Sequence, residues 1–191
     1  MRGRSSRGPA PRASGPMEGL LPPETTRLRD GSTVTVRPIR DADAPRLAAF
    51  HRGLSDETVH FRYGGGFGLS GRTAPSRLAD RCHAHTGEVV LVAEAEGAPR
   101  SALLAVARLV PVPDEPGTAE FAIVVRDDRQ GLGLGTALLR RLFEAGRRAG
   151  VARVVGVVLP ENARMLRLCQ RLGAKTRAVP EDGIVLATVG A

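Results

Sequence analysis

The residues best placed for chemistry lie in a glycine-rich segment, Gln130-Gly-Leu-Gly-Leu-Gly-Thr136, between a β-rich run and an amphipathic helix pattern. Glycines carry no Cβ atom, so successive backbone N–H groups can approach the oxygens of a phosphate. The partial positive charge at the N-terminus of a helix strengthens that attraction. The segment therefore predicts an anion-binding loop. The alternative is a turn that only connects a strand to a helix.

Two familiar phosphate-binding motifs do not fit these residues. A P-loop needs Gly-Lys followed by Ser or Thr, and the sequence has no such triplet. A Rossmann fingerprint needs a third glycine where Thr136 stands, and it follows the first strand of a βαβ unit. The segment here follows three consecutive strand patterns, so both motifs are disfavoured.

Those three strand patterns cover residues 88–96, 101–110 and 118–125, and short segments with Gly and Pro separate the runs. Sequential strands with short connections predict an antiparallel meander. After the glycine segment, leucines and Phe143 recur at helical spacing while charged residues take the opposite face. This is the clearest helix in the sequence.

The remaining patterns place these elements in one domain. Further strands are expected over 33–37, 154–159 and 184–189, and helices over 42–52, from Ser55 toward His60, over 75–83 and over 162–172. The order predicts an α/β fold, with a mixed, mostly antiparallel twisted sheet flanked by helices. We expect a disordered basic tail over residues 1–25 and the folded domain over residues 26–191.

The basic charge of the chain is concentrated in that tail. Half of the net charge of +8 comes from four arginines within residues 1–16, a segment without acidic residues. A segment rich in Arg, Gly, Ser and Pro cannot bury a core. With no tryptophan and few other aromatic residues, the chain is poorly equipped to stack on single-stranded nucleic acid. Nucleic-acid binding is therefore disfavoured, apart from the tail.

Membrane, secretory and metal-binding classes are also disfavoured. The longest apolar runs fall far short of the ~18 residues that span a bilayer. The N-terminus lacks the apolar region of a secretory signal, so a cytoplasmic location is expected. Cys82 and Cys169 are expected as free thiols. Cys82-His-Ala-His85 has no second ligand cluster in the sequence, and we expect no metal.

The glycine segment carries a family resemblance. Val125-Arg-Asp-Asp-Arg-Gln-Gly-Leu-Gly-Leu-Gly135 resembles the acetyl-CoA loop of the GNAT acetyltransferase superfamily, whose core of Gln or Arg, two residues, Gly, one residue, Gly matches at Gln130, Gly133 and Gly135. A later stretch, from Leu159-Pro-Glu-Asn162 to Leu172-Gly173, is similar to the next family element. Segments near residues 28–44, 53–58 and 118–122 resemble the catalytic domain of bacterial Pat-type protein lysine acetyltransferases.

The resemblance implies a site for acetyl-CoA. Its pantetheine chain would pair with the backbone of Val124 and Val125 at the end of the strand. Its pyrophosphate would lie on the backbone N–H groups of Gln130, Gly131, Leu132, Gly133, Leu134, Gly135 and Thr136. The backbone N–H of Val125 is the oxyanion donor that the family implies. Asn162 faces the coenzyme in the family and is also a good helix N-cap.

Glu120 is the candidate general base. Strand alternation over 118–125 places Ala119, Phe121, Ile123 and Val125 on one face and Glu120 on the other. It matches the glutamate of the family's Ala-Glu element, and a carboxylate whose pKa is raised by partial burial can take a proton from an ammonium group. The alternative is a solvated carboxylate paired with an arginine.

One position departs from the family pattern. Cys169 stands where many GNAT enzymes have a tyrosine that protonates the leaving thiolate, so that acid is missing. A buried thiol in the core is the expected role for Cys169.

Together these features predict an acetyl-CoA-dependent N-acetyltransferase, an acyltransferase of the EC 2.3.1 class, in which the amine attacks the thioester directly. The expected acceptor is a protein lysine side chain, and a small-molecule amine is the alternative. Two other classes stay open: a non-catalytic CoA-binding regulatory module and a nucleic-acid binder.

Overall fold

The computed structural model describes residues 21–64, 73–74, 88–95 and 102–190. The expected helix over 75–83, Cys82 and the tail up to residue 20 lie outside the described residues. Leu21 is only 2% exposed and packs into the core, and the first strand, β1, covers Glu24–Arg27. The expected boundary between residues 25 and 26 therefore falls inside a strand, and residues 24 and 25 belong to the sheet instead of to the tail.

The described strands form one sheet of eight, in the order β1-β2-β3-β4-β5-β6-β8-β7. Neighbours are antiparallel except β5 and β6, which are parallel. The mostly antiparallel mixed sheet and its β3-β4-β5 meander are confirmed. The strands span Glu24–Arg27 (β1), Thr33–Pro38 (β2), Val89–Ala95 (β3), Leu103–Pro111 (β4), Thr118–Val125 (β5), Arg153–Val158 (β6), Lys175–Val179 (β7) and Ile184–Gly190 (β8).

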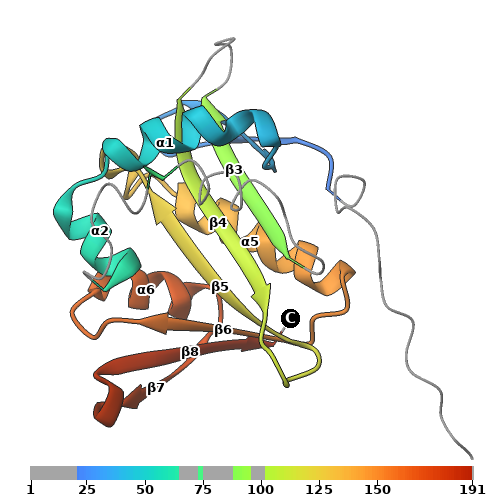
Figure 1. Cartoon of the computed structure of the whole chain (residues 1–191), viewed down its shortest axis with the longest axis vertical. Helices are drawn as coiled ribbons and strands as arrows, with labels where there is room; N and C mark the ends of the chain where they lie inside the picture. Colours follow the sequence, from blue (N-terminus) through green and yellow to red (C-terminus); the bar gives the residue numbers. More distant parts are fainter. Residues whose placement is uncertain (1–20, 65–72, 75–87, 96–101, 191) are drawn as a thin grey trace, which may run out of the picture.

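Helices cover both faces of the sheet (Figure 1). The described α-helices are α1 (Ala44–Arg52), α2 (Asp56–Tyr63), α5 (Leu134–Arg148) and α6 (Ala163–Arg171). The apolar sides of α5 and α6 join the larger core cluster on one face, and α1 and α2 join a second cluster with β3, β4 and β5 on the other. Among the described residues, no helix is long and apolar enough to cross a membrane.

Side-chain caps explain where two of these helices begin. The Ser55 hydroxyl accepts the N–H of Thr58 at 3.2 Å at the start of α2. The Asn162 amide oxygen accepts the N–H of Met165 at 3.0 Å at the start of α6. Both caps satisfy N–H groups that have no partner within the helix, and both starts agree with the sequence-based expectation.

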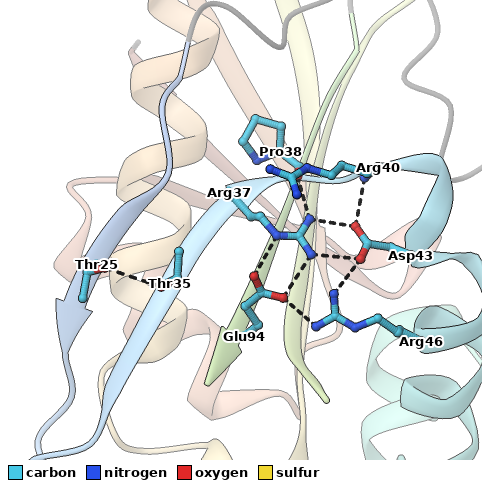
Figure 2. A network of polar contacts seen from close by, with 8 residues as sticks. All are labelled: Thr25, Thr35, Arg37, Pro38, Arg40, Asp43, Arg46 and Glu94. Carbon is cyan, nitrogen blue, oxygen red and sulfur yellow. Dashed lines mark hydrogen bonds and ion pairs between the residues drawn. The ribbon is translucent and has the colours of Figure 1, made fainter. Parts of the chain in front are cut away.

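A buried ion-pair network fixes α1 to the sheet (Figure 2). Arg37 on β2 donates two hydrogen bonds to Asp43, at 2.7 and 2.9 Å, and two to Glu94 on β3, at 2.8 and 3.0 Å. Arg46 on α1 contacts the same two carboxylates at 2.7 and 2.5 Å. Arg37 and Asp43 are 5% and 2% exposed, so the network links β2, β3 and α1 inside the protein.

A glycine on β6 allows close packing against β5. A Cβ atom at residue 156 would lie 2.2 Å from the ring of Phe121. We expect Gly156→Ala to lower the free energy of unfolding by about 1–3 kcal/mol through overpacking, measured by urea denaturation. Gly190→Ala is the matched control, because nothing lies within 4 Å of that Cβ position. Equal losses in the two variants would contradict this explanation.

Candidate active site

The site lies where two parallel strands separate. β5 and β6 pair at Thr118, Ala119 and Glu120, and no further along β5. Beyond this point β5 stays paired with β4 as far as Val125, and β6 stays paired with β8 as far as Val158. The two strands therefore diverge toward their C-terminal ends (Figure 1). A cavity of about 700 Å³ is lined by these strand ends together with α2, α6 and the glycine segment.

The strand register determines which backbone groups face the gap. Thr118 and Arg126 are hydrogen-bonded to the β4 side, through Val112 N–H to Thr118 C=O at 3.0 Å and Arg126 N–H to Leu104 C=O at 2.9 Å. The register between them is unbroken, so even-numbered residues of β5 bond to β4 and odd-numbered residues face away from it. The backbone N–H of Val125 therefore points into the gap.

The same register corrects one expectation. Val124 is paired with Val106 of β4, so its backbone groups are directed away from the gap. Ile123 takes its place beside Val125 as a residue whose backbone can meet an extended chain. The sequence could not distinguish these neighbours, because the choice depends on which side of β5 holds the antiparallel partner.

The glycine segment has the geometry of an anion-binding loop. Gly131 and Gly133 have φ angles of +79° and +96°, which favour glycine, and Gly133 is the N-cap of α5. The N–H groups of the first turn, from Leu134 to Thr136, have no partner within the helix. The side chains of Leu132 and Leu134 pack into the core, so these two residues present only their backbone.

Gln130 braces the end of β5 instead of projecting freely. Its Nε2 donates to the carbonyl of Val125 and to the hydroxyl of Thr58, both at 3.0 Å. Its Oε1 accepts a hydrogen bond from Arg164 on α6. The Val125 carbonyl is thereby occupied, which leaves the N–H as the polar group that this residue presents to the gap.

Glu120 lies at the point where the strands begin to separate. It is the last residue of β5 that is paired with β6, and it lines the cavity. The predicted alternation is confirmed, since Ala119, Phe121, Ile123 and Val125 pack with α5 and α6 on the other face. The side chain is exposed, not partly buried as expected. Within the described part of the chain it has no hydrogen-bond or salt-bridge partner, so the arginine pairing is not seen there.

Two other sequence candidates have clear positions. Asn162 caps α6 and also lines the cavity, so its role as a helix cap is compatible with the position facing the coenzyme that the resemblance implies. Cys169 is 2% exposed within the core, and burial raises the pKa of its thiol to about 11. The chain's one tyrosine, Tyr63, contacts His51, with its hydroxyl 3.4 Å from Nδ1. Tyr63 is not among the described residues that line the cavity.

Several site residues were missed by the sequence analysis. Arg29, in the turn between β1 and β2, donates its N–H to the carbonyl of Leu132 at 3.0 Å and extends its guanidinium to that of Gly131. Its partners lie about a hundred residues away, so spacing gave no signal. Among the described residues, five arginines and three glutamates line the cavity, which gives this part of it a basic lining suited to an anionic ligand: Arg29, Arg62, Arg164, Arg167 and Arg171, against Glu57, Glu120 and Glu161.

Asp127 was also missed, although it follows β5 closely. Its carboxylate accepts hydrogen bonds from the backbone and hydroxyl of Ser55 and from the hydroxyl of Thr58. Burial alone would raise the pKa of Asp127, but these hydrogen bonds outweigh it and hold the pKa below its usual value. Among the described residues, no group of three His, Cys, Asp or Glu side chains is placed to hold a metal ion.

The chain is similar to known proteins of one family. The acetyltransferase (GNAT) domain family matches residues 33–175. The acetyltransferase PA5475 of Pseudomonas aeruginosa is 32% identical over 155 residues, which is 81% of this chain and 82% of that protein. The GNAT domain of S. lividans PAT superposes with a TM-score of 0.78 at 29% identity, covering 88% of this chain and 97% of that domain. The Salmonella typhimurium protein yncA, solved with its cofactor acetyl-CoA, shares the fold, with a TM-score of 0.60 at 23% identity over 82% of this chain and 93% of that one.

Proposed function

Because the chain belongs to the GNAT acetyltransferase family, we propose that it transfers the acetyl group of acetyl-CoA to an amine that attacks the thioester directly. The observation that carries the proposal is the gap between β5 and β6. It has Glu120 at the point where the strands separate and the Val125 N–H farther along, next to the glycine loop. In this proposal the coenzyme, its acyl group and the amine meet in this gap.

The coenzyme would lie along the β5 side of the gap. The N–H groups of residues 131–136 and the basic lining suit a pyrophosphate, whereas the Gln130 N–H already donates to the Asp127 carbonyl. The free backbone groups of Ile123, next to the Val125 N–H, suit an amide of a pantetheine chain. The fold neighbour solved with acetyl-CoA supports this choice of ligand. Asn162 lines the same cavity from the β6 side.

Two groups of the chain would carry the chemistry. The Val125 N–H would donate to the thioester oxygen as negative charge develops there. The Glu120 carboxylate would accept the proton of the attacking ammonium, directly or through water, and its exposure allows that proton to pass on to solvent. The leaving thiolate would be protonated without help from a tyrosine.

The acceptor we propose is a lysine side chain of a protein. The support is the similarity to the GNAT domain of S. lividans PAT, which extends over nearly that whole domain. Incubation with acetyl-CoA and a set of lysine peptides, followed by mass spectrometry, should detect acetyl-lysine. Acetylation of free small amines with unmodified peptides would overturn the choice of acceptor but not the acetyl transfer.

Coenzyme binding can be tested without knowing the acceptor. A ligand at about 100 times its Kd adds about 2.7 kcal/mol to stability, so acetyl-CoA should raise the thermal midpoint by about 5–10 °C. Gly131→Asp should abolish the rise, because it places a negative charge in the loop. Gly131→Asn should keep most of it. Both side chains tolerate the positive φ, and nothing lies within 4 Å of this Cβ position. No rise in the unsubstituted protein would contradict the proposal.

A further inference from the structure

One carboxylate attaches helix α2 to the chain just before the glycine loop, residues 130–136. Asp127 lies two residues after the end of β5 and three before Gln130. Its Oδ2 accepts the Ser55 N–H at 3.0 Å, and its Oδ1 accepts the hydroxyls of Ser55 and Thr58 at 2.6 and 2.7 Å. Ser55 and Thr58 form the N-cap and first turn of α2. The start of α2 is therefore attached to the segment that leads into the loop.

The Thr58 hydroxyl extends this attachment to the loop itself. It donates its single proton to Asp127 and accepts a hydrogen bond from Gln130 Nε2 at 3.0 Å. The same Nε2 donates to the Val125 carbonyl. A continuous set of hydrogen bonds thus runs from the end of β5 through Gln130 and Thr58 to Asp127. We name these last three residues the α2 junction.

The far end of α2 reaches the opposite side of the gap. His60 Nε2 lies 3.2 Å from Oε1 of Glu161, which precedes α6. Phe61 and Arg62 line the cavity. Helix α2 therefore crosses from the β5 side to the β6 side and forms a wall of the cavity that also contains Glu120 (Figure 1).

We propose that the α2 junction couples coenzyme binding to the ordering of α2. Because α2 forms a wall of the cavity, this coupling extends to the place where the acceptor amine binds. A helix of eight residues depends on tertiary contacts for its stability. A ligand that binds the ordered loop therefore also stabilises a helix attached to that loop. Asp127 acts as a positioning residue through Ser55 and Thr58. This inference rests on the proposed function, because the coenzyme must bind at the loop.

Hydrogen exchange of the full chain with and without free CoA tests the coupling. In the unsubstituted protein, CoA should slow hydrogen exchange both in the loop and in α2. In α2 the effect should be about tenfold, which corresponds to the free energy of one charge-assisted hydrogen bond. In Asp127→Asn, which removes the charge and keeps the shape, CoA should still protect the loop, but its effect on α2 should fall to about twofold or less.

Asp128→Asn is the matched control. This neighbouring acid accepts two hydrogen bonds from Arg126, both at 2.6 Å, and within the described ranges it has no hydrogen bond or ion pair with α2. The control should keep the full effect of CoA on α2. If CoA protected α2 in Asp127→Asn as fully as in the unsubstituted protein, the proposed coupling through the α2 junction would be wrong. An unprotected loop in the unsubstituted protein would instead contradict the proposed function.

A second variant keeps the test valid if Asp127→Asn does not fold. Thr58→Val has nearly the same shape and removes only the shared hydroxyl. By itself, Thr58→Val should weaken the CoA-dependent protection of α2. Where Asp127→Asn folds, the double variant should lose no more than Asp127→Asn alone, as expected for residues in one network. Strictly additive losses, or none in Thr58→Val, would overturn the proposed transmission through Thr58.

Discussion

Replacing Glu120 by glutamine is expected to slow acetyl transfer by about 10²–10⁴-fold while leaving the thermal shift caused by acetyl-CoA unchanged. The amide keeps the size of the side chain but cannot take a proton from the ammonium. The position supports a large effect, because Glu120 is the last β5 residue paired with β6 and its side chain lines the cavity. The coenzyme contacts proposed along the loop and the β5 backbone do not involve this carboxylate.

The pH profile of the variant distinguishes proton transfer from a change in shape. Free lysine side chains have a pKa of ~10.4, so the fraction of neutral amine rises with pH. The variant should therefore recover activity as pH increases, relative to the unsubstituted protein. Steady-state rates on a lysine peptide between pH 7 and 10 measure this.

Glu57→Gln is the matched control for Glu120→Gln. Glu57 lines the same cavity from α2, so its substitution changes the charge of the cavity by the same amount. It should slow transfer far less than Glu120→Gln does. Equal losses in the two variants would show that the cavity charge matters and that Glu120 is not the base.

The elements around the site were predictable where the pattern is local. Strand 118–125 was predicted with the bounds that β5 has, because alternating side chains report which residues share a face. The same alternation placed the side chains of Glu120 and Phe121 on opposite faces of the sheet. The glycine loop was predictable from composition, since a backbone at positive φ calls for glycine.

Features set by contacts distant in the sequence were not predictable. β7 was missed because its residues from Lys175 to Ala178 are exposed, so no apolar face marks a strand. Thr58 is hydrogen-bonded to Asp127 and Gln130, which lie about 70 residues later in the chain. Nothing in their spacing indicates it. Arg37 in β2 gave no sign of burial, because an arginine in a strand is usually found at the surface.

Removing the carboxylate of Asp43 is expected to lower the free energy of unfolding by about 3–5 kcal/mol at pH 7. Arg37 donates two hydrogen bonds to Asp43 from a position that is only 5% exposed. In Asp43→Ala that guanidinium keeps Glu94 and the Pro38 carbonyl but loses two of its five acceptor atoms. Arg46 and the N–H of Arg40 lose a partner as well. Urea denaturation measures the loss.

The control lies in the same turn. Asp41 precedes Asp43 by two residues and is exposed, so Asp41→Ala should cost less than about 1 kcal/mol. A comparable loss in both variants would show that the turn, and not the buried network, responds to the substitution.

The network should also give stability a pH dependence with a defined sign. Burial would raise the pKa of Asp43, but hydrogen bonds from Arg37 and the Arg40 N–H, with the charges of Arg37 and Arg46, hold it below its ordinary value. Arg37 likewise lowers the pKa of Glu94. A carboxylate with a lowered folded pKa stabilises fully above its unfolded pKa, about 4, and loses that contribution as pH falls through the folded pKa. Stability should therefore fall below about pH 4 more steeply in the unsubstituted protein than in Asp43→Ala. Parallel curves would mean that other carboxylates dominate.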